Sequence, residues 1–317
     1  MISNNKTLIF GLFMVTAFSQ EVKWMSIGDL HNWYSAAGCE IETGRTGQVS
    51  DQQDGLRYPA FYRVQDNQAA KGLWLGATNF YDPVVNKDYE YKVVHAGPRH
   101  LDIESETMPV DISMDGKYDH PNVFVDGDPA TNLQYLDDVD NIDPSLSSDR
   151  RINNIVQTSI GVQMKRTIYA FAHPDHQNYH IQEYVFTNNG CFDADCNTSY
   201  EQTLEGFQVY LQYRYAISRE GMVYDGNWLP QSAAWGHNTM NDVIGEHPDA
   251  PSTNDQFYDD GEIMRALFSW QGYHSDASFD NIGGPNAPGE GHLGAAQFVG
   301  VVTLHADTSP ADDTDNI

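Results

Sequence analysis

The chain has 317 residues, of which 40% are hydrophobic and 12% aromatic, so it does not have the composition of an intrinsically disordered protein. Its 45 acidic and 17 basic residues give a net charge of −28, which disfavours nucleic acid and anionic membrane surfaces as partners because both would repel it. Three explanations of the excess of acidic residues are open: solubility in a salty medium, binding of divalent cations, and a partner surface coated with cations. The length fits one large β-rich domain or two ordinary domains.

Residues 1–19 have the pattern of a secretory signal peptide. Lys6 gives a positive start, residues 8–18 form an apolar run, and Ala17 and Ser19 are small residues at the positions that a signal peptidase recognises. The run is shorter than the roughly 20 apolar residues that span a bilayer. A buried N-terminal helix or strand fits the charge order less well. We therefore expect cleavage after Ser19 and export to the cell surface, the medium or the periplasm, with no membrane insertion afterwards.

Aromatic and alternating runs predict strands along most of the remaining chain. These runs are residues 72–80, 89–96, 159–171, 178–187, 204–216, 263–270 and 295–306. Connections rich in Gly, Pro and Asp separate them, and only residues 144–146 suggest a short helix. The pattern predicts an all-β protein, an antiparallel β-sandwich with long loops and little helix.

One sandwich domain is expected over residues 20–306. The acidic, loop-like segment 111–150 is the best candidate for a boundary inside it. Residues 307–317 are expected to be an acidic linker, in a chain expected to be part of a longer protein.

Closely spaced aspartates around a Gly-containing turn suggest a calcium site. The candidate ligands are Asp126, Asp128, Asp138 and Asp140. Calcium binds six to eight oxygen atoms and accepts flexible loop geometry, although this spacing is not that of an EF-hand. The alternative is a solvated acidic loop whose aspartates cap turns.

Three histidines and a carboxylate, in residues 173–180, could bind zinc if the loop brought His173, His176 and His180 together. An exposed loop leading into an edge strand is the favoured interpretation.

For the cysteines, the spacing of Cys191 and Cys196 after an Asn-Asn-Gly turn predicts a disulfide that leaves Cys39 free. Three reduced thiols are the alternative, and the absence of a Cys-x-x-Cys pair argues against a zinc ribbon.

Trp228 and Trp235 lie in turn-rich sequence and are the candidate ligand-binding residues, because amphipathic rings can stack on sugars. The alternative is that they close the end of the sandwich. The other tryptophans are expected in the core: Trp24, Trp33, Trp74 and Trp270.

Acidic pairs in residues 246–249 and 259–262 could serve a glycan hydrolase, which needs two carboxylates about 5 to 9 Å apart. The sequence has no Gly-x-Ser-x-Gly, His-Glu-x-x-His or phosphate-binding Gly-x-x-x-x-Gly-Lys motif.

Several short motifs mark the first and middle parts of the chain. They are residues 24–35, 53–60, 72–76, 96–99, 149–150, 154, 158–161 and 183–188. Together they resemble a group of uncharacterised exported proteins of marine Gram-negative bacteria, often long chains with further β-sandwich modules and C-terminal sorting signals. The resemblance implies export and a β architecture, and it implies no activity and no catalytic residue.

These observations predict an exported structural or adhesive β-sandwich module, with a glycan or cell-surface component as its candidate partner and calcium as its candidate cofactor. The competing hypothesis is a secreted glycan-active hydrolase on the same scaffold. A cleft with two carboxylates beside Trp228 or Trp235 would favour the enzyme, and a flat surface with solvated acids would favour the module.

Overall fold

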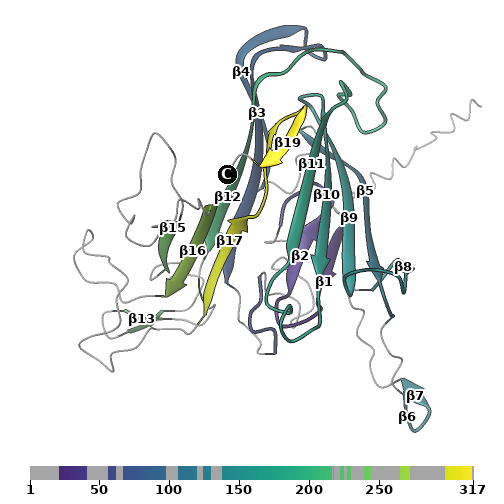
Figure 1. Cartoon of the computed structure of the whole chain (residues 1–317), viewed down its shortest axis with the longest axis vertical. Helices are drawn as coiled ribbons and strands as arrows, with labels where there is room; N and C mark the ends of the chain where they lie inside the picture. The colour runs from purple at the N-terminus through teal and green to yellow at the C-terminus, as the bar shows by residue number, and fades with distance from the viewer. Residues whose placement is uncertain are drawn as a thin grey trace, which may run out of the picture.

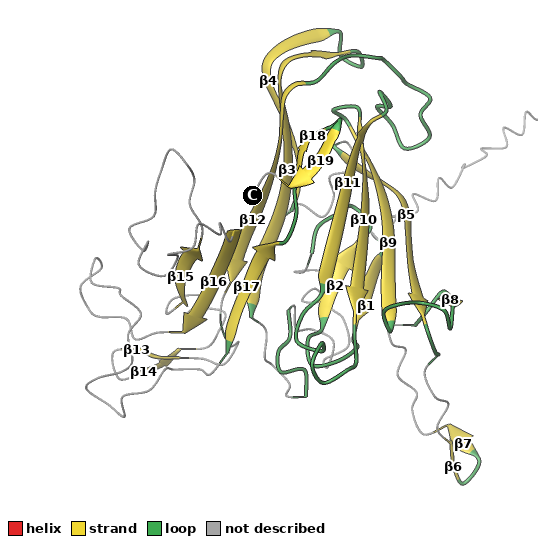
Figure 2. Ribbon diagram, viewed as in Figure 1, coloured by secondary structure: helices red, strands yellow, loops and turns green. Residues whose placement is uncertain are grey.

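The computed structural model describes residues 21–40, 56–61, 67–97, 106–119, 124–129, 138–215, 217, 222–224, 227–229, 239–244, 265–271 and 297–315. Within these residues the protein is built from strands and contains no helix, as Figure 2 shows. Its strand pairs are antiparallel apart from one short parallel pair. The prediction of an all-β, antiparallel protein is therefore confirmed.

One sheet has five strands. Their order is β11 (Ile181–Asn188), β10 (Val162–Ala170), β9 (Arg150–Thr158), β5 (Thr107–Gly116) and β8 (Asn141–Ile142). The parallel pair joins β5 to β8. The acidic segment 111–150, expected to be loop-like, thus contributes part of β5 and all of β8 to this sheet, and β9 begins at its end. The short helix suggested at 144–146 does not form, and a turn stands there, in which the Asp143 carboxylate accepts a hydrogen bond from the Ser145 amide.

The second sheet has three strands. Their order is β12 (Glu205–Tyr215), β3 (Gln68–Asp82) and β4 (Lys87–Ala96). A hairpin of β1 (Val22–Met25) and β2 (Asn32–Ser35) extends this sheet through Glu40, which bridges Tyr34 on one side and Lys71 on the other. Tyr34, Glu40 and Lys71 therefore lie side by side across neighbouring strands, although they come from separate parts of the chain.

The two sheets face each other across a shared core (Figure 1). Leu73 and Leu75 of β3 pack into the same buried cluster as Val156 of β9 and Met164 of β10. Alternation places these residues on the inner faces, since successive side chains of a strand point to opposite sides. Burial of such side chains contributes about 1.5–3 kcal/mol each and supplies most of the stability of the sandwich.

Smaller elements lie outside the sandwich. They are a sheet of β15 (Thr239–Ile244), β16 (Arg265–Gln271) and β17 (Phe298–Thr303), and the hairpins β6–β7 (Phe124–Val125, Asp128–Pro129), β13–β14 (Met222–Tyr224, Asn227–Leu229) and β18–β19 (Asp307–Ser309, Asp312–Asp315). The last hairpin occupies the segment for which the sequence predicts an acidic linker. The described residues include no helix that is long and apolar enough to cross a membrane. Residues 1–19 lie outside the described part, so export stays a prediction.

Candidate functional site

Trp74 lies on the outer face of β3 and is 39% exposed. The prediction that it belongs to the core is wrong, because Leu73 and Leu75 occupy the inward positions and the two-residue period turns Trp74 outward. Gly72 and Gly76 share its face, so no other side chain of β3 stands directly beside it. A Cβ atom on Gly72 would lie 3.3 Å from the indole Nε1, which shows how closely the ring lies over the strand.

The other predicted core tryptophans are placed differently. Trp24 and Trp33 are buried, with ring centroids 4.7 Å apart, and Trp270 is partly buried in β16.

Two neighbouring strands each place a ring against Trp74. His95 lies opposite it on β4 and Tyr210 lies opposite it on β12. Both ring centroids are 5.9 Å from that of Trp74, with interplanar angles of 60° and 73°. These edge contacts are a favourable arrangement for aromatic pairs and hold the indole in place. We call Trp74, Tyr210 and His95 the Trp74 cluster.

Polar groups surround the Trp74 cluster on the same face. Gln212 lies opposite Gly72 and Gln208 lies opposite Gly76, so the two glutamines flank Tyr210 along β12. Among the described residues, neither glutamine side chain has a hydrogen-bond partner. Glu106 Oε2 accepts a hydrogen bond from the His95 amide at 3.0 Å and lies 2.8 Å from the His95 Nδ1 atom. The cluster thus combines exposed ring faces with amide donors and acceptors.

The inner face of the same sheet carries a row of buried polar residues. Glu40 and Lys71 form an ion pair in which each side chain is only 3% exposed. Tyr213 lies opposite Lys71 on β12, with its ring centroid 4.9 Å from the ammonium nitrogen. Lys71 Nζ also donates to Gln182 Oε1 and to Tyr184 Oη of the facing sheet, both at 3.1 Å. We call these five residues the Lys71 network.

The electrostatics of the Lys71 network favour the ion pair. Burial alone would raise the pKa of the Glu40 carboxyl, but the Lys71 charge and the hydrogen bonds from Lys71 and Asn32 outweigh it and hold the pKa below its usual value. Burial alone would lower the pKa of Lys71, yet the Glu40 charge raises it well above its usual value. The Arg166 guanidinium, bonded to Gly38 O and Ser35 O at 2.9 Å, adds a second buried cation nearby.

His180 is half-buried beside this network, which separates it from the other two histidines of the zinc hypothesis. The Tyr34 hydroxyl donates to His180 Nδ1 at 2.8 Å, and His180 Nε2 donates to the Leu30 carbonyl at 3.0 Å. Burial lowers the pKa of His180 to about 4, so the ring is neutral at pH 7. His173 and His176 are exposed with ring centroids 5.5 Å apart. The structure therefore does not bring the three imidazoles together.

The four candidate calcium ligands are spread over separate elements. Asp126 and Asp128 are exposed in the β6–β7 hairpin, which projects beyond β8 in Figure 1. Asp138 is exposed, whereas the Asp140 carboxylate accepts hydrogen bonds from Lys23 Nζ at 2.9 Å and from the Met114 amide at 2.6 Å. Among the described residues, no group of three or more His, Cys, Asp or Glu side chains is placed to hold a metal ion. Calcium binding stays a prediction.

Melting curves recorded with and without calcium test the predicted site. Saturating calcium at 100 times its Kd would stabilise the folded chain by about 2.7 kcal/mol, which raises Tm by several degrees. The shift should disappear on chelation and should be smaller with magnesium, which demands stricter geometry. Asp126→Asn with Asp128→Asn should reduce it without disturbing the Asp140 contacts. Equal shifts from calcium, magnesium and matched ionic strength would show general screening of the −28 charge instead.

The sequence-based ligand-binding residues are only partly described. The backbone of Trp228 lies in β14, opposite Val223 of β13. Trp235 and the acidic pairs in residues 246–249 and 259–262 lie outside the described residues. The hypotheses of sugar binding by Trp228 and Trp235 and of a hydrolytic pair therefore stay predictions.

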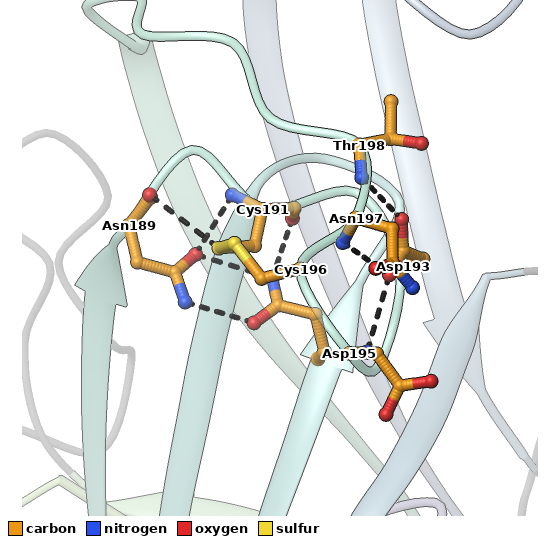
Figure 3. The surroundings of a disulfide bond; sticks show 8 residues. Asn189, Cys191, Asp193, Asp195, Cys196, Asn197 and Thr198 are labelled. Carbon is orange, nitrogen blue, oxygen red and sulfur yellow. Dashed lines mark hydrogen bonds between the residues drawn. A yellow bond between two sulfur atoms is a disulfide. The ribbon is translucent and has the colours of Figure 1, made fainter.

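Cys191 and Cys196 are joined by a disulfide (Figure 3), the pairing that the sequence favours. Cys39 is a buried free thiol. Within the loop, the Asp193 carboxylate accepts hydrogen bonds from the amides of Asp195, Asn197 and Thr198, at 3.1, 2.9 and 2.6 Å. The disulfide and the carboxylate together order this loop, whose two cysteines are five residues apart in the sequence.

Thiol labelling should distinguish the three cysteines. Under denaturing conditions without reductant we expect one label, on Cys39, because the other two sulfur atoms are bonded to each other. After reduction we expect three labels. Without denaturant Cys39 should react slowly, since its thiol is buried and burial raises its pKa. Three labels before reduction would rule out the disulfide in the purified chain.

Comparison with known proteins adds no assignment: no protein-family model, no curated protein and no solved structure matches this chain. The site must therefore be argued from its own residues. Sequence reasoning missed Trp74 and Tyr210, although the alternation in Gly72-Leu-Trp-Leu-Gly76 places the tryptophan and both glycines on the face opposite the leucines. The Lys71 network had no comparable signal, because Lys71 and Gln182 are 111 residues apart.

Proposed function

We propose that the protein is an exported structural or adhesive β-sandwich module that binds glycan through the Trp74 cluster. The observation that carries this proposal is the exposed indole of Trp74, held between Tyr210 and His95 on a paired strand. Aromatic side chains fixed on rigid elements provide large contact areas at a low cost in conformational entropy. Their ring faces suit the C–H surfaces of pyranose sugars, and the neighbouring amides suit sugar hydroxyls.

The position of the glutamines supports a sugar rather than a purely apolar ligand. Gln208 and Gln212 present amides on either side of Tyr210, which is 56% exposed. An amide both donates and accepts, which matches the hydroxyl groups of a sugar. The net charge of −28 favours neutral over acidic polysaccharides, since like charges repel on approach. We therefore propose a neutral glycan.

The hydrolase hypothesis receives less support at this surface. Glycoside hydrolysis needs two carboxylates facing each other across the scissile bond. Within the described residues, the Glu106 carboxylate contacts the Trp74 cluster, and it is occupied by His95. A binding module is therefore the function that the geometry supports best.

Substitution of Trp74 tests the proposal. Trp74→Ala should weaken binding to a neutral polysaccharide by roughly thirtyfold, because removing a central aromatic contact costs about 2 kcal/mol. Tyr210→Ala should act in the same direction, and Gln208→Ala less strongly. The folded structure should persist, since all three side chains lie on the outer face of the sheet.

The control is Tyr118→Ala, an exposed tyrosine beyond the end of β5, which should bind like the parent chain. Affinity electrophoresis with neutral and anionic polysaccharides, together with melting curves for each variant, provides the measurement. Binding of Trp74→Ala equal to the parent, or no retardation of the parent by any neutral polysaccharide, would contradict the proposal.

A further inference from the structure

The Lys71 network places an amine, a carboxylate and a carboxamide in contact inside the sandwich. Lys71 on β3 is paired with Glu40 and lies 3.1 Å from Gln182 Oε1 on β11, in the opposite sheet. The Tyr184 hydroxyl donates to the same Gln182 oxygen at 2.7 Å. Glycan binding on the outer face uses none of these groups.

These contacts supply each role that an acyl transfer requires. An amine beside a base is a nucleophile, and a carboxamide whose oxygen receives a hydrogen bond is a polarised electrophile. Lys71 Nζ lies 3.1 Å from Gln182 Oε1, and holding the two side chains in contact replaces an intermolecular encounter and removes much of the entropic barrier. We propose that the side chains of Lys71 and Gln182 become joined by an amide bond that links the two sheets, with Glu40 as the base.

The atoms of this step balance without an oxidant, water or cofactor. Glu40 takes a proton from the Lys71 ammonium, and a rotation of the Gln182 side chain presents its Cδ to the neutral amine. The Nζ–Cδ bond forms while Tyr184 stabilises the negative charge on Oε1. Glu40 then returns the proton to the Gln182 nitrogen, which is attached to the same carbon as Nζ. The Cδ–Nε2 bond breaks and ammonia leaves, while Glu40 accepts the second proton of Nζ and passes it to the departing ammonia, so that the products are a neutral amide and an ammonium ion.

The surroundings favour a single slow reaction within the folded chain. The ion pair is the resting state, so only the minor neutral pair reacts. Lys71 and Glu40 are removed from water, and the Tyr184 and Tyr213 rings lie 5.6 and 4.9 Å from the Lys71 nitrogen, which limits competing hydrolysis. A second carboxamide, Asn32, has its nitrogen 2.8 Å from Glu40 Oε2. Gln182 is preferred because Lys71 itself contacts it.

Peptide mapping of the purified, reduced chain tests the proposal. A joined pair should give one branched peptide containing Lys71 and Gln182, lighter than the sum of its parts by one ammonia, and trypsin should not cut after Lys71. The mapping is done on this peptide because an N-terminal Gln20, exposed by cleavage after Ser19, also loses ammonia when it cyclises. Free Lys71 and Gln182 peptides would overturn the proposal, and a branch from Lys71 to Asn32 would overturn the choice of Gln182.

Variants test the assigned roles. Lys71→Arg keeps the positive charge and Gln182→Leu removes the acceptor, so neither should yield the branched peptide. Glu40→Gln should reduce its yield at least tenfold, because the base is lost. Lys92→Arg is the matched control, since Lys92 pairs with Asp82 on the same sheet, and it should give the branched peptide in full yield. A branched peptide that survives Glu40→Gln unchanged would overturn the role of Glu40.

Discussion

Relative to the chain in which the Lys71 amine is free, replacing Lys71 by Met is expected to lower the free energy of unfolding by about 3–5 kcal/mol, because removing one partner of a buried ion pair leaves the other charge unpaired. In the parent chain, Lys71 and Glu40 are each only 3% exposed, so water cannot replace the lost partner without a rearrangement. The ammonium also donates to Gln182 and Tyr184 of the facing sheet, and these acceptors would lose their donor.

The control for this prediction is the double variant Lys71→Met with Glu40→Gln, which should recover part of the loss. Neither variant can form the proposed Lys71–Gln182 bond, so their difference reports the unpaired carboxylate alone. Lys92→Met is the comparison and should cost less, because Lys92 is more exposed than Lys71 and the Asp82 carboxylate also accepts hydrogen bonds from the Val84 and Val85 amides. Denaturant unfolding at pH 7 measures all three. Equal stabilities of the parent and Lys71→Met would show that the pair does not contribute.

The sequence predicts the strands well because their signal is local. In β10, Val162 and Met164 are buried and Gln163 between them is more exposed, a two-residue period that is readable without tertiary information. The sequence does not predict β9, whose buried positions include the polar residues Arg150 and Asn154. The sequence also predicts the disulfide from a local signal, since its two cysteines are only five residues apart in the sequence. Both features depend on residues close together in the chain.

The sites were harder to predict because they join distant residues. The sequence predicts Trp74 in the core. In the structure the facing sheet covers Leu73 and Leu75, and Trp74 between them therefore points outward. The Lys71 network depends on Glu40 bridging β2 to β3 and on β11 lying opposite, which no spacing in the sequence encodes. A lone Lys in a strand is typical of a solvated face, and here it is buried.

Stability is expected to fall as pH decreases from 6.5 towards 4, because the half-buried His180 stays neutral in the folded state. Its pKa is lowered from 6.5 to about 4, and that of His31 is lowered to about 3, in both cases mainly by burial. Between these values and 6.5, the unfolded chain binds protons that the folded chain does not, so the free energy of unfolding decreases as protons are added. At 1.36 kcal/mol per unit, His180 alone removes about 2 kcal/mol between pH 6.5 and 5.

His180→Gln should flatten this pH dependence while keeping a donor for the Leu30 carbonyl and an acceptor for the Tyr34 hydroxyl. The remaining slope should come from His31, whose ring lies near the Arg57 charge. The Glu40 charge favours protonation of His180 but does not overcome the effect of burial, and the Glu40 carboxyl itself contributes only below pH 4.5. His173→Gln changes an exposed histidine and should retain the slope of the parent chain. Unfolding free energies at pH 7, 6 and 5 measure the effect, and an unchanged slope in His180→Gln would show that the His180 ring accepts a proton without unfolding.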